Sequence, residues 1–363
     1  MTASPQPLFP FEKTLAGRRL LITGHTGFTG GWLSLWLKLI GAEVAGLALA
    51  PNTSPNLFSA ASVADGLDSM IGDIRDAATV KEAVARAAPE VIFHLAAQPL
   101  VSRAFEDPLE SFATNVLGTV HVLEAARNTP GVKAVVCITT DKVYADQAWP
   151  WGYREIDALG GKDPYSASKA CTELVAASYR ATLAARGNGV RIATARGGNI
   201  IGGGDWSDNR IVPDFVRAVT SGNGLTIRNP EAVRPWQHVL ALVHGYMVLA
   251  HNLMTVPETD ASWNFGPRTD EMKPVSALLE ALQANWTQIP IDVTPGAFPE
   301  THFLHLDSTK ARRSLGWRPP IDFAGTVALT TDWYRRQAQD PGATRAITLE
   351  QIAGYRAGID GQA

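Results

Sequence analysis

The chain has 363 residues, of which 45% are hydrophobic, and a formal net charge of −3. This length and apolar content allow a large buried core, which excludes a mainly disordered protein. Acidic and basic residues are interspersed, so we expect no nucleic-acid partner. The two cysteines, Cys137 and Cys171, lie in apolar segments without metal-ligand spacing, which excludes a disulfide framework and predicts no metal site.

The apolar stretch at residues 31–50 is almost long enough to span a membrane. Lys38, Gly41 and Glu43 interrupt it and no basic flank orients it, so we expect a buried helix followed by a strand, and no membrane association. The proline-rich N-terminus has no apolar run before a cleavage site. We therefore expect no secretory signal and a cytoplasmic location.

Short apolar runs alternate with longer helical segments between Arg19 and Arg196, which is typical of a parallel sheet covered by helices on both faces. One run, at residues 91–95, is nearly all apolar, as expected for a central strand. The sequence therefore predicts a doubly wound α/β fold with a Rossmann sheet. The expected strands are Leu20–Thr23, Val44–Leu49, Ser69–Gly72, Val91–Leu95, Ala134–Thr139 and Arg191–Ala195.

The sequence changes character after Arg196. Three consecutive glycines at 202–204 and short segments rich in Trp and Pro favour a smaller second domain. Residues 239–253 are expected to form a buried helix, and residues 263–266 a strand that could rejoin the first sheet. We expect a cofactor-binding domain over residues 1–198, with 237–267 returning to it, and a substrate-binding domain over 199–236 and 268–363.

A glycine-rich turn follows the first expected strand. Gly24, Gly27 and Gly30 let the backbone turn tightly and approach a pyrophosphate, whose charge then lies at the N-terminus of a helix opening near residue 31. A tight turn without a ligand is the alternative, but the strand, the glycine spacing and the helix together favour a dinucleotide. We expect Thr26 and Phe28 of this turn to contact the same cofactor.

The choice between NAD and NADP has little support in the sequence. Residues 50–54 replace the acidic residue that usually binds the ribose hydroxyls, and they contain no arginine for a 2′-phosphate, so we favour NAD. Asn52 or Thr53 could contact the ribose instead. Asp73, followed by Ile74, comes after the third strand, where its carboxylate could accept from an adenine amino group or cap the next turn.

Tyr165 and Lys169 are the first catalytic candidates. They lie four residues apart in an expected helix, so both side chains share one face. A nearby ammonium lowers the pKa of a phenol from its usual value of about 10 and helps it to act as a general base. This spacing is also common by chance, and an amphipathic surface helix is the alternative.

The segment 137–144, with the sequence CITTDKVY, ends the fifth strand, where open α/β sheets bind ligands. Together with the glycine turn and residues 94–98, it resembles the extended short-chain dehydrogenase/reductase family across most of the chain. The resemblance implies NAD, with Tyr165, Lys169 and the Thr140 hydroxyl acting at C4 of a sugar. It also implies cofactor contacts from Leu95, Ala96, Ala97, Gln98, Asn115, Tyr165 and Lys169.

Within that family, residues 139–144 are similar to the signature of sugar-nucleotide 4,6-dehydratases. The resemblance implies that NAD takes a hydride from C4 and returns it to C6, and that Asp141 protonates the departing C6 hydroxyl. Most such enzymes follow this Asp with a Glu that removes the C5 proton, whereas this chain has Lys142. Lys142 and the segments 151–155, 198–206 and 228–238 resemble the members of the family that act on CDP-glucose, which is the expected substrate.

The role of Lys142 stays open between two alternatives. An ordinary lysine is protonated at neutral pH, so Lys142 needs desolvation or a neighbouring cation, such as Lys169, to remove a proton. Alternatively, a charged Lys142 stabilises the enolate while another base acts. We favour the first. A 4-epimerase would need neither Asp141 nor Lys142, and a nucleotide-binding protein without turnover would not need the Tyr165–Lys169 pair.

The second domain must hold a nucleotide diphosphate, which guanidinium groups bind bidentately. Arg234 is the first candidate because it lies in the segment 228–238, although surface arginines often form only weak ion pairs. Asn199, directly after the sixth strand, could bridge to the pyrophosphate or serve as a turn residue. The expected substrate contacts are Asn199, Arg210, Arg228, Arg234 and His238.

Three further expectations concern structure rather than chemistry. We expect His94 to be a core histidine. The resemblance implies a homodimer, or a higher homo-oligomer, packed through the helices around residues 115–127 and 165–180. It also implies that the C-terminal segment 306–317 closes the second domain.

Overall fold

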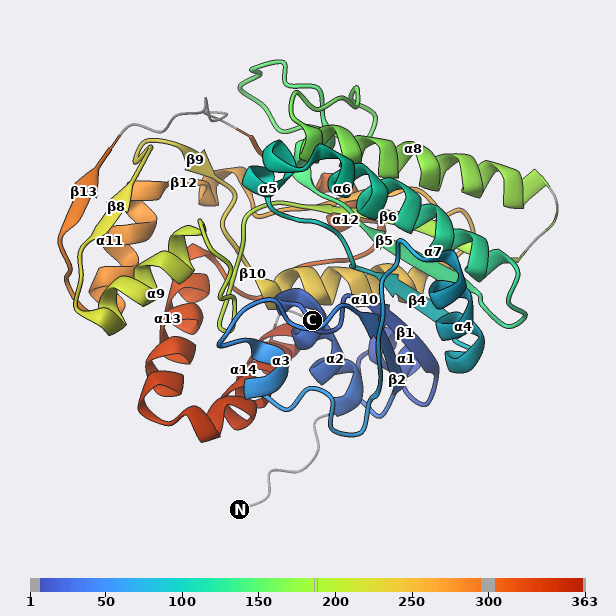
Figure 1. Ribbon diagram of the computed structural model, residues 1–363, viewed down its shortest axis with the longest axis horizontal. Helices are drawn as coiled ribbons and strands as arrows, with labels where there is room; N and C mark the ends of the chain where they lie inside the picture. Colours follow the sequence, from blue (N-terminus) through green and yellow to red (C-terminus); the bar gives the residue numbers. More distant parts are fainter. Residues whose placement is uncertain (1–6, 186, 188, 295–303, 362–363) are drawn as a thin grey trace.

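The structure is a computed structural model that describes residues 7–185, 187, 189–294 and 304–361 (Figure 1). Within these residues, a parallel sheet of seven strands in the order β11-β6-β5-β4-β1-β2-β3 forms the centre. The predicted strands coincide with β1 to β6 to within two residues at each end, which confirms the doubly wound α/β fold. The strands are β1 (Arg19–Thr23), β2 (Glu43–Ala48), β3 (Asp68–Ile71), β4 (Val91–His94), β5 (Ala134–Ile138), β6 (Arg191–Gly197) and β11 (Ser262–Phe265).

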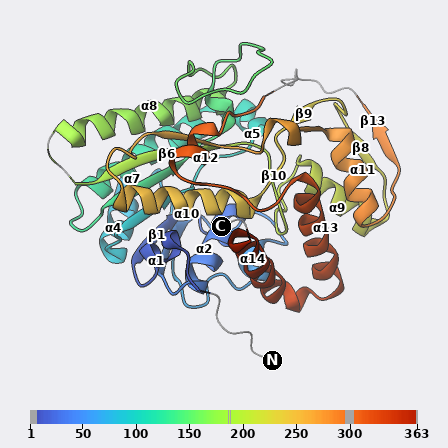
Figure 2. The same cartoon turned by 180° about the vertical axis from the view of Figure 1, so that it is seen from behind.

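Helices cover both faces of the sheet (Figures 1 and 2). On one face, α4 (Ala77–Ala87), α7 (Gly118–Arg127) and α8 (Pro164–Ala185) form an apolar core with the strands. On the other face, α1 (Pro10–Leu15), α2 (Phe28–Leu39) and α10 (Val239–Thr255) do the same. The strands are apolar along their length because both faces are buried. The carboxyl ends of the strands therefore form the edge at which functional loops can meet.

A smaller region lies beside the sheet. Its helices are α9 (Ile211–Ser221), α11 (Val275–Asn285) and α13 (Phe323–Gln339) (Figure 1). Its short strands pair β7 (Ile200–Ile201) with β10 (Gln237–His238), β8 (Leu225–Ile227) with β13 (Ile291–Val293), and β9 (Val233–Arg234) with β12 (Lys273–Pro274). The last helix, α14 (Thr344–Asp360), returns to α2, and its Arg356 forms a buried ion pair with Glu12 of α1 at 2.8 Å.

Shorter helices complete the chain. Two of them, α5 and α6, lead into a π-helical turn, η1, directly before α7. A 3-10 turn, η2, is separated from the end of β5 by two residues. It carries part of the predicted catalytic segment. The short elements are α3 (Leu57–Ala60), α5 (Val101–Glu106), α6 (Pro108–Phe112), η1 (Ala113–Leu117), η2 (Asp141–Val143), η3 (Thr269–Glu271), α12 (Thr309–Ser314) and η4 (Pro341–Ala343).

The chain returns to the large sheet after residue 237. α10 packs beneath β5 and β6, and β11 pairs in parallel with β6. The division into two domains stays a prediction, and residues 1–6, 295–303 and 362–363 of the predicted domains lie outside the described residues. The apolar stretch 31–50 forms α2 and β2, and no helix among the described residues has the length and apolarity to cross a bilayer.

Candidate functional site

The predicted glycine turn joins β1 to α2. Gly24 has φ of +83°, and a Cβ there would lie 2.8 Å from the backbone nitrogen of Ala96. A Cβ on Gly30 would lie 2.1 Å from the Gly24 carbonyl oxygen, so both positions require glycine. α2 begins at Phe28, and its N-cap Gly27 provides no side-chain cap. The first N–H groups of α2 therefore remain available for an anion such as a pyrophosphate.

The loop after β4 lies against this turn. His94 is buried, with Nδ1 2.7 Å from Thr23 Oγ1 and Nε2 3.0 Å from Thr119 Oγ1. Burial lowers the pKa of His94 to about 3, so the imidazole is neutral, and its core role is confirmed. Thr23 Oγ1 also accepts a hydrogen bond from Ala96 N at 3.2 Å. The partly exposed residues 95–97 are thus fixed beside the glycine turn.

Asn115, which was predicted as a cofactor contact, bonds to other protein groups. It lies in the π-helical turn η1 and is 2% exposed. Its Oδ1 accepts from Gln98 N at 2.8 Å, and its Nδ2 donates to Gln98 O at 3.1 Å and to Ser168 Oγ at 2.9 Å. The Gln98 amide is engaged as well, by Leu100 and Ser111. Both side chains therefore tie the loop after β4 to α8 instead of facing a ligand.

The ends of β2 and β3 form the outer part of the cofactor side. Leu49 and Ile71 are 56% and 60% exposed there, which suits the apolar face of an adenine, and sequence reasoning missed both. The Thr26 hydroxyl donates to Leu49 O at 2.9 Å. The Asp73 carboxylate accepts from Arg75 Nε at 2.8 Å, and this hydrogen bond lowers the pKa of Asp73.

Ile74 follows this segment and is 4% exposed. Its side chain fills the space beside Gly118, where a Cβ would lie 2.6 Å from Ile74 Cδ1. Its carbonyl oxygen lies 2.8 Å from His121 Nδ1. The side chain of Ile74 therefore belongs to the core, and its contact with a cofactor stays a prediction.

Tyr165 and Lys169 lie on the first turns of α8, and both are buried. Lys169 Nζ donates to the carbonyl of Ile138, the last residue of β5, at 3.2 Å. Burial lowers the pKa of Lys169 to about 8 and raises the pKa of Tyr165 to about 12, while the Thr140 hydroxyl opposes the second shift. The expectation that Lys169 lowers the pKa of Tyr165 is therefore corrected, because in the protein alone burial has the larger effect.

Thr140, Asp141 and Lys142 form the turn that follows β5. Thr140 Oγ1 donates to Asp141 Oδ1 at 2.9 Å and accepts from Lys142 N at 3.3 Å. Asp141 is 3% exposed, and burial raises the pKa of its carboxyl group, although Lys142 and Arg234 oppose this shift. A carboxyl group in this environment is suited to hold a proton and donate it as an acid.

Lys142 lacks desolvation, one of the two conditions under which it could act as a base; the other is a neighbouring cation. Its side chain is exposed, whereas Lys169 is buried and bonded to Ile138. Its charge acts on the neighbouring Asp141. The position therefore suits a solvent-exposed side chain next to the acid better than a desolvated base.

A buried ion pair lies behind this turn, and sequence reasoning missed it. Arg196 of β6 binds Glu173 of α8 through two hydrogen bonds, Nη2 to Oε2 at 2.8 Å and Nε to Oε1 at 2.9 Å, and both side chains are at most 2% exposed. The Thr139 hydroxyl donates to Glu173 Oε1 at 2.5 Å, and Arg196 Nη1 donates to the Tyr144 hydroxyl at 2.7 Å. The pair thus anchors both ends of the segment 139–144.

The substrate candidates separate into two groups. Arg210 forms an ion pair with Asp205 at 3.3 Å, and its charge also acts on Tyr165. Arg234 of β9 acts in the same way on Asp141, and Asn199 lies between β6 and β7 at the carboxyl edge. Arg228 is exposed, and the group that it influences is Asp214 of α9. The structure therefore brings Arg210 and Arg234, but not Arg228, towards the catalytic residues.

His238 is buried at the start of α10, and its contact with the substrate stays a prediction. It has no exposed surface, and its Nδ1 accepts from Leu240 N at 3.2 Å, which caps α10. Burial lowers the pKa of His238 to about 3, and its ring packs edge-on against Trp32. A neutral, enclosed ring of this kind serves the structure of the helix start.

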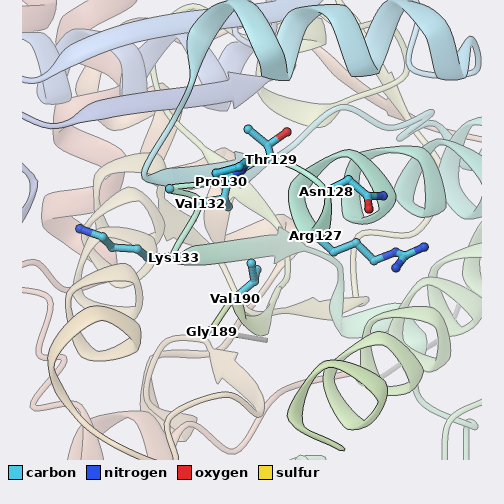
Figure 3. A pocket seen from close by; sticks show the side chains of 9 residues that line it. Arg127, Asn128, Thr129, Pro130, Val132, Lys133, Gly189 and Val190 are labelled. Atoms are coloured by element: carbon cyan, nitrogen blue, oxygen red, sulfur yellow. The ribbon is translucent and has the colours of Figure 1, made fainter. Parts of the chain in front are cut away.

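A surface pocket of about 430 Å³ lies at the opposite edge of the sheet (Figure 3). It is lined by residues 127–133 and 189–190, which precede β5 and β6. Because open α/β sheets bind ligands at the carboxyl ends of their strands, we assign it no part in the chemistry. Among the described residues, no cluster of His, Cys, Asp and Glu is arranged to hold a metal ion.

Known proteins resemble the chain over most of its length. Residues 21–330 match the family described as GDP-mannose 4,6 dehydratase. A CDP-glucose 4,6-dehydratase of Salmonella typhimurium is 44% identical over 326 residues, which cover 88% of this chain and 91% of that protein. A dTDP-glucose 4,6-dehydratase of Streptomyces antibioticus is 33% identical over 278 residues, covering 73% and 75%.

Solved structures give the same picture. A double mutant of a dTDP-glucose 4,6-dehydratase from Streptomyces venezuelae, solved with NAD bound, matches with a TM-score of 0.76 and 26% identity, covering 88% of this chain and 98% of that one. The resemblance to the extended short-chain dehydrogenase/reductases is thereby confirmed. The chain belongs to the GDP-mannose 4,6 dehydratase family.

Proposed function

We propose that the protein removes one water from CDP-glucose to give CDP-4-dehydro-6-deoxy-glucose, with NAD as a retained hydride carrier. The observation that carries the proposal is a buried Asp141, with a raised pKa, at the same strand end as Tyr165, Lys169 and Thr140. A 4-epimerase has no need for an acid here. The choice of CDP-glucose rests on the relative with 44% identity.

The glycine turn fits NAD. Its two sterically required glycines bring the backbone close to the uncapped start of α2, where a pyrophosphate can bind. The exposed side chains of Leu49 and Ile71 lie where the adenosine end would follow. NAD would supply a hydride acceptor for C4 of the sugar and a hydride donor for C6.

The residues of the chain then have distinct proton-transfer roles. The phenolate form of Tyr165 takes the proton of the C4 hydroxyl. The Thr140 hydroxyl, which opposes the rise in the pKa of Tyr165, stabilises this form, and Lys169 holds the helix at β5. The C4 carbonyl makes the C5 proton acidic. That proton passes to solvent water, which reaches the exposed Lys142, and the cation of Lys142 stabilises the enolate that forms. Asp141 donates its proton to the C6 hydroxyl, and the C6–O bond breaks to release water.

This sequence balances. The proton gained by Tyr165 offsets the one given by Asp141, the hydride moves from C4 to C6, and C5 takes back a proton from water when the hydride reaches C6. The sugar therefore loses only the elements of water. We also propose that Arg210, Arg234 and Asn199 contact the nucleotide diphosphate, since they lie on the same edge of the sheet.

A homodimer is part of the proposal. Apolar side chains of α5, α6 and η1 lie on the surface near α8, which carries a further exposed leucine. Exposed apolar surface of this kind is typical of a protein interface. The residues are Phe105, Leu109, Phe112, Leu117 and Leu174. Because the cysteines are unpaired, we propose a reducing, cytoplasmic location.

The test is to incubate the purified protein, without added NAD, with CDP-glucose and separately with dTDP-, UDP- and GDP-glucose. Mass spectrometry would follow the loss of one water. We expect loss from CDP-glucose. Loss only from another sugar nucleotide would overturn the cytidine assignment, and no loss from any of them, even with NAD supplied, would overturn the dehydratase.

A further inference from the structure

The backbone of Gly198, directly after β6, lies against the carboxylate of Asp141. A Cβ on Gly198 would lie 2.1 Å from Asp141 Oδ2 and 2.8 Å from Asp141 Cγ. Both distances are far shorter than carbon–oxygen or carbon–carbon contact allows. The carboxylate therefore occupies the space that any side chain at position 198 would take.

Neighbouring groups keep Gly198 from moving away. Pro235 also lies close to Gly198, and its Cγ would be 3.1 Å from the same Cβ. The buried amide of Gln237 donates to Gly198 O at 3.1 Å and to Phe265 O at 3.0 Å, and Gln237 N donates to Asn199 O at 3.2 Å. The backbone at 198 is thus tied to the end of β11, and a larger residue would displace Asp141 rather than the backbone.

We propose that Gly198, fixed in place by Gln237, is a positioning residue that admits the Asp141 carboxyl group to the point where the C6 hydroxyl departs. The proposal rests on the proposed dehydration. Gly198 acts on the acid step, because the three atoms nearest to a Cβ at this position belong to Asp141 and Pro235. Oxidation at C4 should therefore not depend on it.

The first test is Gly198→Ala. A misplacement of about 1 Å costs on the order of 10²-fold, so we expect the rate of water loss to fall by roughly that factor. The absorbance of reduced nicotinamide should still rise when CDP-glucose is added. The matched control is Gly354→Ala in α14, where nothing lies within 4 Å of a Cβ. This variant should remove water from CDP-glucose at the wild-type rate.

The pH profile gives a second readout that a general packing defect would not move. If the alanine pushes the Asp141 carboxyl group out of its buried place, the pKa of that group falls towards its ordinary value. The decline of water loss at high pH should then begin at a lower pH in Gly198→Ala than in the wild type. An unshifted profile would contradict the inference.

A double-mutant cycle keeps the test sound if Gly198→Ala folds poorly. Asp141→Ala removes the carboxylate and leaves room for the new Cβ, so Gly198→Ala should add little to the effect of Asp141→Ala on folding and on water loss. If the effects of Gly198→Ala and Asp141→Ala on water loss are fully additive, or if Gly198→Ala removes water at the wild-type rate, this inference is overturned and the proposed function is not. If the wild type releases no water from any sugar nucleotide, the proposed function fails with it.

Discussion

The two halves of the sheet edge are built in different ways. At the ends of β1 to β4, the backbone itself forms the site, through glycines that allow close approach of the turn, the next loop and a helix start. At the ends of β5 and β6, side chains form it, through a buried acid, a buried lysine and an ion pair behind them. The first half therefore depends on shape, and the second on the burial of polar groups.

The largest effect is expected from Asp141, the buried acid at the end of β5. Asp141→Asn keeps the size of the side chain but cannot donate the proton, so water loss should slow by ~10²–10⁴-fold. Reduced nicotinamide should still form, because the C4 oxidation does not use Asp141. Mass spectrometry and absorbance of the same reaction would measure both steps.

The control for this variant is Asp68→Asn, an exposed residue at the start of β3 that pairs with Arg86, which should leave both steps unchanged. In the wild type, water loss should decline as the pH rises through the raised pKa of Asp141, since only the protonated form can donate. If Asp141→Asn slowed the oxidation at C4 as much as the loss of water, Asp141 would not act in the second step alone.

The next effect is on stability. Arg196→Met leaves Glu173 buried without its cation, which should lower the free energy of unfolding by about 3–5 kcal/mol. Arg336→Met removes the same group from the exposed pair with Glu350 and should cost about 0–1 kcal/mol. Urea denaturation of the wild type and both variants would give the free energies of unfolding. Similar losses in the two variants would refute the importance of burial.

The smallest of these effects is expected at the glycine turn after β1. Gly24→Ala and Gly41→Ala both force a residue with φ above +80° to carry a side chain, at a cost of ~1–2 kcal/mol, but only at Gly24 does the Cβ collide with backbone. We expect Gly24→Ala alone to lose bound NAD. The NAD content of the purified variants would measure this, and equal retention in both would contradict the backbone cradle.

This contrast also explains what could be predicted from the sequence. The strands and the glycine turn depend on local patterns, apolar runs and glycine spacing, and these were placed to within two residues. The spacing of Tyr165 and Lys169 correctly placed both on one helix face. Local patterns are enough where the backbone decides the structure.

Burial decides the remaining positions, and it depends on residues far apart in the sequence. Arg196 and Glu173 come from different elements, so neither shows its partner in the sequence, although a charged residue in the otherwise apolar β6 was a signal. His238 and Asn115, which were predicted as ligand contacts, are bonded to the start of α10 and to the loop after β4, and the sequence does not show this burial. Lys142, for which a base made neutral by desolvation or by a neighbouring cation was favoured, is exposed.

The most direct test of the account follows a hydride within one molecule. CDP-glucose carrying deuterium at C4 would be incubated with the protein in ordinary water, and the product would be examined by mass spectrometry and NMR. We predict a product that has lost one water and carries the deuterium on the C6 methyl group. Deuterium retained at C4, with no water lost, would contradict the dehydratase and favour an epimerase.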